Sequence, residues 1–75
     1  MTFHVRETVW NKGKPERNLL LPPIFKVRLE AVDHIRLLQN SYDRNGFDQK
    51  QDEWWARFDG KGAIHRWTIE EDDED

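Results

Sequence analysis

The sequence of 75 residues contains no cysteine, which removes two common ways of stabilising or equipping a small domain. No disulfide can form and no thiolate can bind a metal, so a disulfide-dependent secreted domain is not expected. A chain of this length buries only about 60% of its unfolded surface, which leaves its stability marginal. Four tryptophans, four phenylalanines and one tyrosine must therefore supply much of the core.

Long apolar runs are also missing. No stretch approaches the ~20 residues that a membrane-spanning helix needs. The segment Met1–Glu7 carries charges where a signal peptide would be apolar. We therefore expect no membrane association, a cytoplasmic location and no cofactor.

Charge is abundant but unevenly spread. Charged residues make up 36% of the chain and the net charge is −3, yet six of the fifteen acidic residues lie in Glu70–Asp75. Residues 1–69 therefore hold twelve basic and nine acidic residues, a net charge of +3. We expect one compact domain over residues 1–69 and a disordered acidic tail over 70–75. The tail could aid solubility, fold back onto the basic body, or contact a basic partner.

The segment Trp54–Ile69 predicts a β-hairpin. Asp59-Gly60-Lys61-Gly62 separates two runs of bulky residues and supplies the positive φ values of a tight turn. A turn at Gly60-Lys61 would place Trp54 opposite Trp67. The period-two alternation then defines a core face with Trp54, Ala56, Phe58, Ala63, His65, Trp67 and Ile69.

The segment Phe3–Trp10 alternates like a half-buried strand. Phe3, Val5 and Val9 share one side, on which Glu7 is the polar exception. Residues 11–15 predict a turn or loop. The leucine- and proline-rich segment Glu16–Pro23 is interpreted as an extended cover over the core.

Residues 24–44 are compatible with two interpretations. A single long helix would carry an apolar stripe, with Leu29 and Leu37 pointing outward; alternatively, a strand runs to about Ala31 before a shorter helix. Both keep a helix from about Val32 to Arg44. Asn45-Gly46 predicts a left-handed helix cap, with Phe47 packing back against the helix. Residues 48–53 predict a polar connection. The stripe consists of Ile24, Val27, Ala31, Ile35, Leu38 and Tyr42.

These elements predict an α+β fold in which one helix packs on one face of a small antiparallel sheet of 3–4 strands. The order is β-α-β-β, or β-β-α-β-β if residues 24–31 form a strand. In either order Phe3, Trp54, Phe58 and Trp67 face the helix stripe.

Catalytic motifs are scarce. Ser41 is the only serine, and the three histidines form no metal-binding pair. His65 is interpreted as a packed or rim histidine. A ribonuclease that works without metal would have to use Arg57, His65, Arg66 and Tyr42. Because His65 and Arg66 alternate across the sheet, they cannot line one site, so we expect no enzyme.

The sheet face opposite the core is the predicted binding surface. Exposed tryptophan and arginine are enriched at protein interfaces, although a cation–π pair between Trp55 and Arg66 would explain those two without a ligand. We expect a protein-interaction or regulatory module, such as an inhibitor or accessory factor, with a protein partner. Single-stranded nucleic acid is the alternative ligand, and a homodimer is open. The predicted binding residues are Arg6, Trp10, Trp55, Arg57 and Arg66.

Overall fold

The structure, a computed structural model, describes residues 1–60 and 62–72. It contains one helix and five strands, in the order β1 (Thr2–Asn11), β2 (Lys14–Phe25), α1 (Arg28–Gln39), β3 (Arg44–Asp48), β4 (Glu53–Arg57) and β5 (Ala63–Asp72). No helix in this part of the chain is long and apolar enough to span a membrane.

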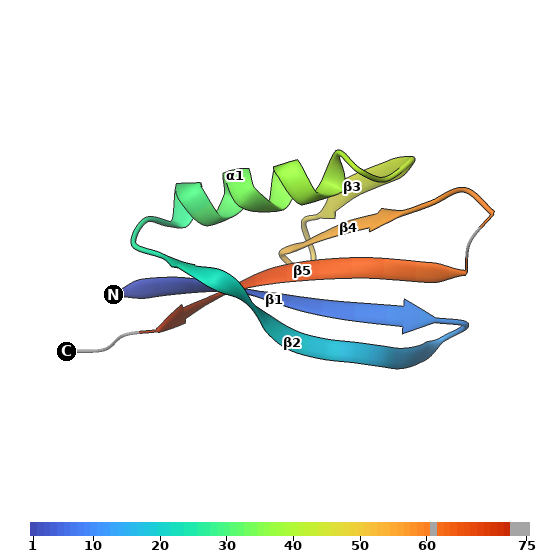
Figure 1. The fold of residues 1–75 in the computed structure, drawn as a ribbon, viewed down its shortest axis with the longest axis horizontal. Coiled ribbons are helices and arrows are strands. Elements are labelled where there is room, and N and C mark those ends of the chain that lie inside the picture. The colour runs from blue at the N-terminus through green and yellow to red at the C-terminus, as the bar shows by residue number, and fades with distance from the viewer. Residues whose placement is uncertain (61, 73–75) are drawn as a thin grey trace.

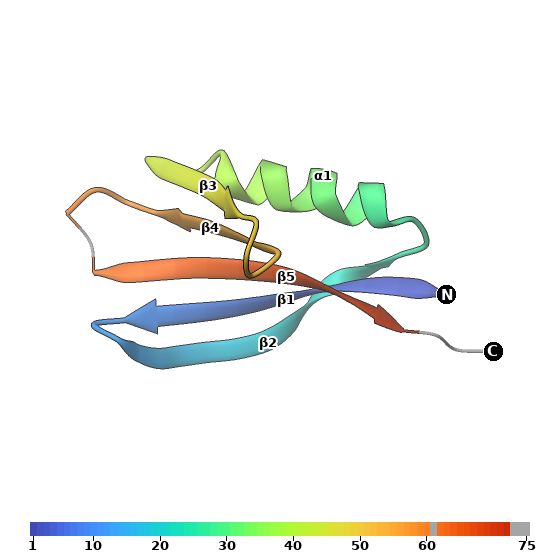
Figure 2. The ribbon, with the colours of Figure 1, turned by 180° about the vertical axis from the view of Figure 1, so that it is seen from behind.

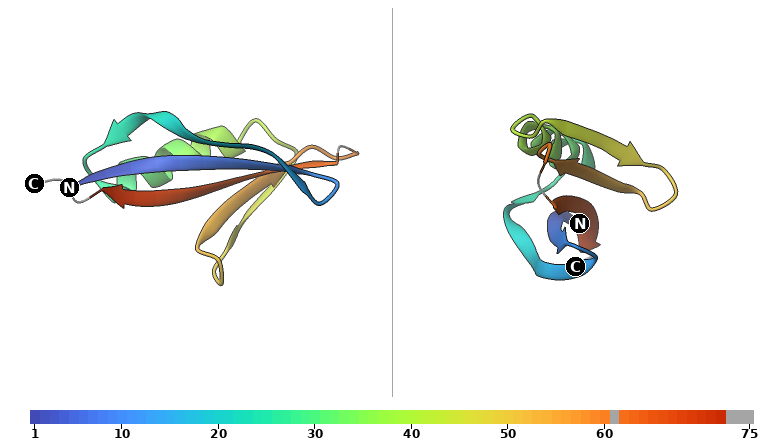
Figure 3. Two further views of the ribbon diagram at one scale, coloured as in Figure 1. Left: turned by 90° about the horizontal axis from the view of Figure 1, so that it is seen from below. Right: turned by 90° about the vertical axis from the view of Figure 1, so that its right-hand side faces the viewer.

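The five strands form one antiparallel sheet with the spatial order β2-β1-β5-β4-β3. Helix α1 lies along one face of this sheet (Figure 1), and β3 and β4 are nearest to the viewer when the molecule is turned around (Figure 2). The sheet is strongly twisted, so the β3–β4 hairpin turns away from the long β1, β2 and β5 (Figure 3). The α+β class is therefore confirmed, with five strands instead of the expected 3–4.

The core lies between α1 and the sheet. Its largest fully buried side chains are Trp67, Ile35 and Val5, and Trp54, Ala31 and Ala56 join them in one cluster. Helix α1 has 12 residues and is about 18 Å long, whereas the ten residues of β1 span about 33 Å. The helix can therefore cover only about half the length of the longest strands.

The predicted β4–β5 register is confirmed. Trp54 faces Trp67, and Trp55 faces Arg66. The strands end at Arg57 and resume at Ala63, so the connection is wider than a two-residue turn. Strand β1 is also confirmed, with Val5, Glu7 and Val9 buried on the helix side.

Glu16–Pro23 is extended, as expected, but it belongs to β2 and pairs with β1 in the sheet instead of lying over the core. Leu19 and Leu21 are half-buried on the helix side, and Leu20 is exposed on the other. Strand β2 is an edge strand, and its free edge needs no backbone N–H donors. Its prolines are therefore tolerated.

Both expectations for residues 24–44 were partly wrong. Strand β2 runs to Phe25, and α1 begins at Arg28 and ends at Gln39. Ala31, Ile35 and Leu38 face the core as the stripe predicts, whereas Ile24 and Val27 are exposed outside the helix. Leu29 and Leu37 point outward, as expected.

The predicted helix cap at Asn45-Gly46 was also wrong, because Asn45, Gly46 and Phe47 lie in β3. Gln39 anchors the end of the helix to the sheet instead. Its side-chain amide donates hydrogen bonds to the carbonyl oxygens of Gly46 and Trp55, at 3.0 and 2.9 Å. The helix therefore stops where its last side chain meets the backbone of two paired strands.

The first half of the predicted disordered tail is ordered. Glu70, Glu71 and Asp72 continue β5 and face His4, Phe3 and Thr2 of β1. Arg6 of β1 offsets part of the repulsion between these carboxylates by pairing with Glu70, and His4 lies 3.6 Å from Asp72. Residues 73–75 lie outside the described residues.

Candidate functional sites

All five predicted binding residues lie on one surface, the sheet face opposite α1, which we term the open face. Strand alternation turns their side chains away from Trp54 and Trp67, which are buried under the helix. Thr8, Arg66, Trp55 and Gly46 form one row across β1, β5, β4 and β3. Within residues 1–60 and 62–72, no second layer covers this face (Figure 3).

Two of the three predicted arginines already have carboxylate partners. Arg6 Nε donates to Glu70 at 2.5 Å, and Arg6 Nη1 donates to Asn18 at 2.6 Å. The hydrogen bond with Glu70 raises the pKa of Arg6 above its ordinary value. Arg66 Nη1 donates to Glu53 at 2.6 Å. The guanidinium charge on this face is therefore largely neutralised by the protein itself.

Trp55 lies over a glycine. A Cβ built on Gly46 would come within 2.8–2.9 Å of three atoms of the Trp55 ring system. The indole therefore packs against the bare β3 backbone. The suggested cation–π pair between Trp55 and Arg66 is not what forms, because Arg66 pairs with Glu53 and the cation–π contact seen in the described residues joins Arg28 to Trp54, at 5.9 Å.

Trp10 and Arg57 are the more available members of the set. Trp10 is 37% exposed and lines a hollow of about 340 Å³ with Gln51, Glu53 and Arg66. Arg57 is half-buried and faces Arg44 across the β3–β4 pair. These two side chains are therefore the best points at which to test binding at the open face.

A second candidate site lies on the helix side of the sheet, beyond the end of α1. Here a hollow of about 320 Å³ is lined by Val9, Glu16, Arg17, Ala63 and His65. Glu7 is not one of the lining residues and is only 8% exposed. Its carboxylate accepts a hydrogen bond from Trp67 Nε1 at 3.0 Å and lies 3.5 Å from Arg17. We term this the Glu7 hollow.

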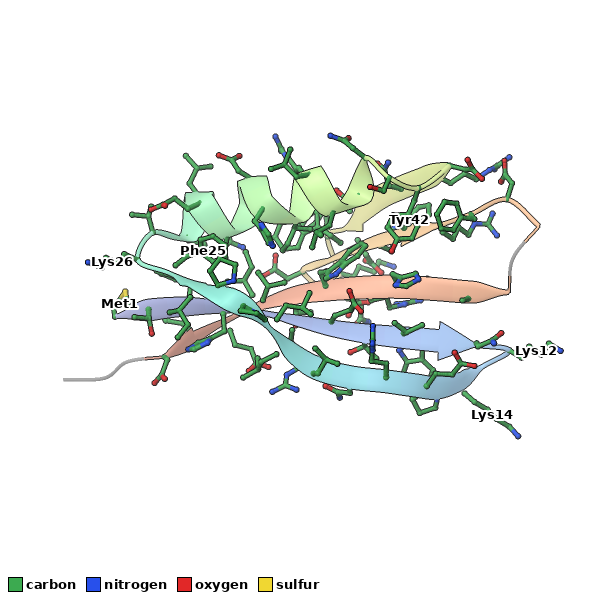
Figure 4. The ribbon with its side chains drawn as sticks, viewed as in Figure 1. Met1, Lys12, Lys14, Phe25, Lys26 and Tyr42 are labelled. Atoms are coloured by element: carbon green, nitrogen blue, oxygen red, sulfur yellow. The ribbon has the colours of Figure 1, made fainter. Side chains whose placement is uncertain are left out.

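Tyr42 lies just after the helix (Figure 4) and packs against His65, which lines the Glu7 hollow. Its ring centre is 4.9 Å from that of His65 and 4.7 Å from that of Phe58. Burial, and secondarily the charge of Glu7, raise the pKa of the Tyr42 hydroxyl above its ordinary value. His65 packs between ring neighbours, as expected, but its Nδ1 is buried and has no hydrogen-bond partner among the described residues.

Sequence reasoning missed Arg17 and gave Glu7 no function, although a signal existed for Glu7. It interrupts an otherwise apolar alternation in Phe3–Trp10, and a buried charge at such a position is costly unless it is paired. Arg17 could not be found, because β2 was not recognised as a strand. The described residues contain no cluster of three or more His, Asp or Glu side chains arranged to hold a metal ion.

Comparison with known proteins gave no match to a family model, a curated protein or a solved structure.

Proposed function

We propose that this protein is a small interaction module, an inhibitor or accessory factor, that binds a partner protein through its open face. The observation that supports this is the composition of the face. It presents aromatic rings beside arginines that are paired with carboxylates, and no described element covers it. Uncovered surfaces of this mixed kind resemble protein interfaces, in which tryptophan and arginine are the anchors.

The same composition disfavours a nucleic-acid ligand. A polyanion gains affinity from cations that are free to meet its phosphates. Arg6 and Arg66 would first have to leave Glu70 and Glu53, and both carboxylates would then repel the phosphates. A protein surface that carries apolar groups with both signs of charge faces no such penalty.

Variants at the available residues test the proposal. Trp10→Ala and Arg57→Ala should each weaken binding to a purified partner, identified by affinity capture and mass spectrometry, by about 30-fold or more if they are hot spots. Leu37→Ala and Arg36→Ala, on the outer face of α1, are matched controls and should leave the Kd unchanged. Sedimentation of the isolated chain tests whether the partner is a second copy.

Two results would contradict the proposal. Equal binding by wild type, Trp10→Ala and Arg57→Ala would remove the open face from consideration. Tight binding of single-stranded oligonucleotides that is lost in the same two variants and falls steeply with salt would show that the ligand is a polyanion. In that case the protein-binding assignment would be wrong, although the surface would be right.

A further inference from the structure

A third hollow, of about 400 Å³, lies on the helix side of the sheet between α1 and the β3–β4 hairpin. We term it the hairpin groove. One of its walls is a stripe along α1 that consists of Arg28, Leu29, Val32 and Arg36. At 3.6 residues per turn, these four positions fall within an arc of about 100° on the helix surface. Val32 is buried, whereas Leu29 and Arg36 are exposed at the solvent side of the stripe.

The other wall of the groove is apolar and belongs to the hairpin. Phe47 of β3 and Trp54 of β4 are register partners, and their ring centres lie 4.8 Å apart. Trp54 is only 7% exposed, whereas Phe47 is 43% exposed and Leu29, on the helix wall, is 64% exposed. The groove therefore has a packed floor and an apolar rim that is open to solvent.

The width of the sheet explains why this rim is uncovered. Five strands at a spacing of about 4.8 Å are about 19 Å wide, whereas one helix with its side chains is about 10 Å wide. Helix α1 packs against β1, β2, β4 and β5, and the β3–β4 hairpin projects to one side beyond it (Figure 3). A second helix can therefore lie beside α1 on the same face, at the usual distance of about 8–10 Å between helix axes.

The groove also carries guanidinium charge that the protein does not neutralise. Arg36 forms no ion pair with any residue among 1–60 and 62–72. Arg28 lies 3.8 Å from Asp52, but these side chains are 50% and 72% exposed, so their attraction is screened by water. The acidic residues of α1, Glu30 and Asp33, do not line the groove. In the Glu7 hollow, by contrast, the one lining arginine is paired with a buried carboxylate.

We propose that the hairpin groove binds an acidic amphipathic helix of a partner protein. Arg28 and Arg36 are eight residues apart on α1, which separates their Cα atoms by about 12 Å along the helix axis. A helix that lies beside α1 meets both arginines when it carries two carboxylates seven or eight residues apart. The apolar side chains between those carboxylates then contact Leu29 and Phe47. This is the helix-in-groove mode of recognition, with charge at both ends of the contact.

Two other occupants fit the groove less well. A polyanion gains affinity from a row of cations, whereas here two arginines flank an apolar rim beside the carboxylate of Asp52. A second copy of this chain would have to offer α1, the only helix among the described residues. Its carboxylates, Glu30 and Asp33, are three residues and about 4.5 Å apart along the axis, which is too close to meet both arginines.

The test uses two synthetic helical peptides of about 15 residues, the length at which an isolated helix becomes stable in water. The acidic peptide carries two glutamates seven residues apart, with leucines three and four residues after the first, and the basic peptide has lysine in place of both glutamates. Binding to the isotope-labelled full chain is followed by the NMR signals of the four indole N–H groups. The acidic peptide should shift the signal of Trp54 and leave those of Trp10 and Trp55, on the open face, in place. The basic peptide should shift none of these three.

Two matched pairs of variants locate the binding site. Leu29→Ala should weaken binding of the acidic peptide by about 5-fold or more, whereas Leu37→Ala, on the same helix but outside the groove, should not. Arg36→Glu should weaken the acidic peptide by a similar factor and allow the basic peptide to bind. Lys14→Glu, on the edge strand at the other side of the sheet, changes the net charge equally and should do neither. All four positions are exposed, so the variants should fold.

The hairpin groove and the open face lie on opposite sides of the sheet, so the two proposals stand or fall separately. Trp10→Ala should bind the acidic peptide as well as wild type does. The groove proposal fails if neither peptide binds, if both bind equally, or if Leu29→Ala and Arg36→Glu bind as well as their controls. A Trp54 signal that shifts with protein concentration alone would show that a second copy occupies the groove. A Trp54 shift caused by a single-stranded oligonucleotide, with steep salt dependence, would show that the ligand is a polyanion. Either result would overturn the assignment to an acidic helix.

Discussion

Gly46→Ala is the change that most directly tests how Trp55 is held on the open face. Its Cβ would meet Trp55 ring atoms at 2.8–2.9 Å, and a fused ring cannot yield as the end of a flexible chain can. Overpacking of this kind costs about 1–3 kcal/mol. For a domain of this size, a loss of 2 kcal/mol lowers Tm by roughly 8–16 °C. Urea unfolding followed by circular dichroism measures the free energy of unfolding of the wild type and of the variant, and the difference between them is the cost of the substitution.

The effect of Gly46→Ala on stability should change sign once the Trp55 ring is removed. Gly46 has no positive φ, so alanine fits its backbone, and alanine in place of glycine reduces the entropy of the unfolded chain. In a Trp55→Thr background, Gly46→Ala should therefore stabilise the protein by about 0.5 kcal/mol. The coupling between the two sites would then be about 1.5 kcal/mol or more, within the range for residues in contact.

An equal cost of Gly46→Ala in both backgrounds would refute this reasoning. It would mean that the glycine is needed for a reason other than the ring, and that Trp55 does not rest on β3. The outcome bears on function as well. A ring fixed in place before binding loses little conformational freedom when a partner arrives, which is what makes rigid aromatic residues effective anchors.

Three further predictions concern single residues. Because the pKa of Tyr42 is raised in the folded state, its contribution to stability is fully present below about pH 10 and is lost as the pH rises through the folded pKa. The free energy of unfolding should therefore fall over that pH range in the wild type and should not do so in Tyr42→Phe. Tyr42 is the only tyrosine, so absorbance at 295 nm follows it alone, and Glu7→Gln should lower its midpoint while burial keeps it above 10. Gln39→Leu removes two hydrogen bonds to strand carbonyls and should cost about 1–3 kcal/mol in thermal unfolding; an unchanged Tm would mean that water satisfies both carbonyls. Leu37→Lys, at 68% exposure, should change stability by less than about 0.5 kcal/mol, and a larger loss would indicate that another copy covers the helix.

The sequence predicted best those features that follow from alternation within one segment. The Trp54–Trp67 register and the outward Trp55 and Arg66 needed only a period of two and a central turn. The prediction of a helix cap at Asn45-Gly46 was wrong because glycine serves two purposes in proteins. It permits positive φ, which suggests a helix cap, and it permits close approach of another group, which is what the Trp55 ring uses here.

Features that depend on the position of a strand in the sheet were harder to predict. Three prolines argue against a central strand, but β2 is an edge strand, and edges are known only once the strand order is known. The structure of the acidic residues after Ile69 was hard to predict for the same reason. They continue β5 beside β1, where Arg6 pairs with Glu70 and His4 lies 3.6 Å from Asp72, and that juxtaposition depends on the β1–β5 register.

The presence of a glutamate at position 7 is the feature that the stability of the fold explains least. Trp67 Nε1 needs an acceptor, but a neutral glutamine would supply one without the desolvation that a buried carboxylate suffers. Arg17 offsets part of that penalty from 3.5 Å away, although its own side chain is largely exposed and its charge is therefore screened. If packing alone mattered, Glu7→Gln should be as stable as wild type or more so. The hydrogen bond from Trp67 Nε1 and the ion pair with Arg17 are the two contacts that hold the carboxylate, so the stability of Glu7→Gln measures how far they offset its burial.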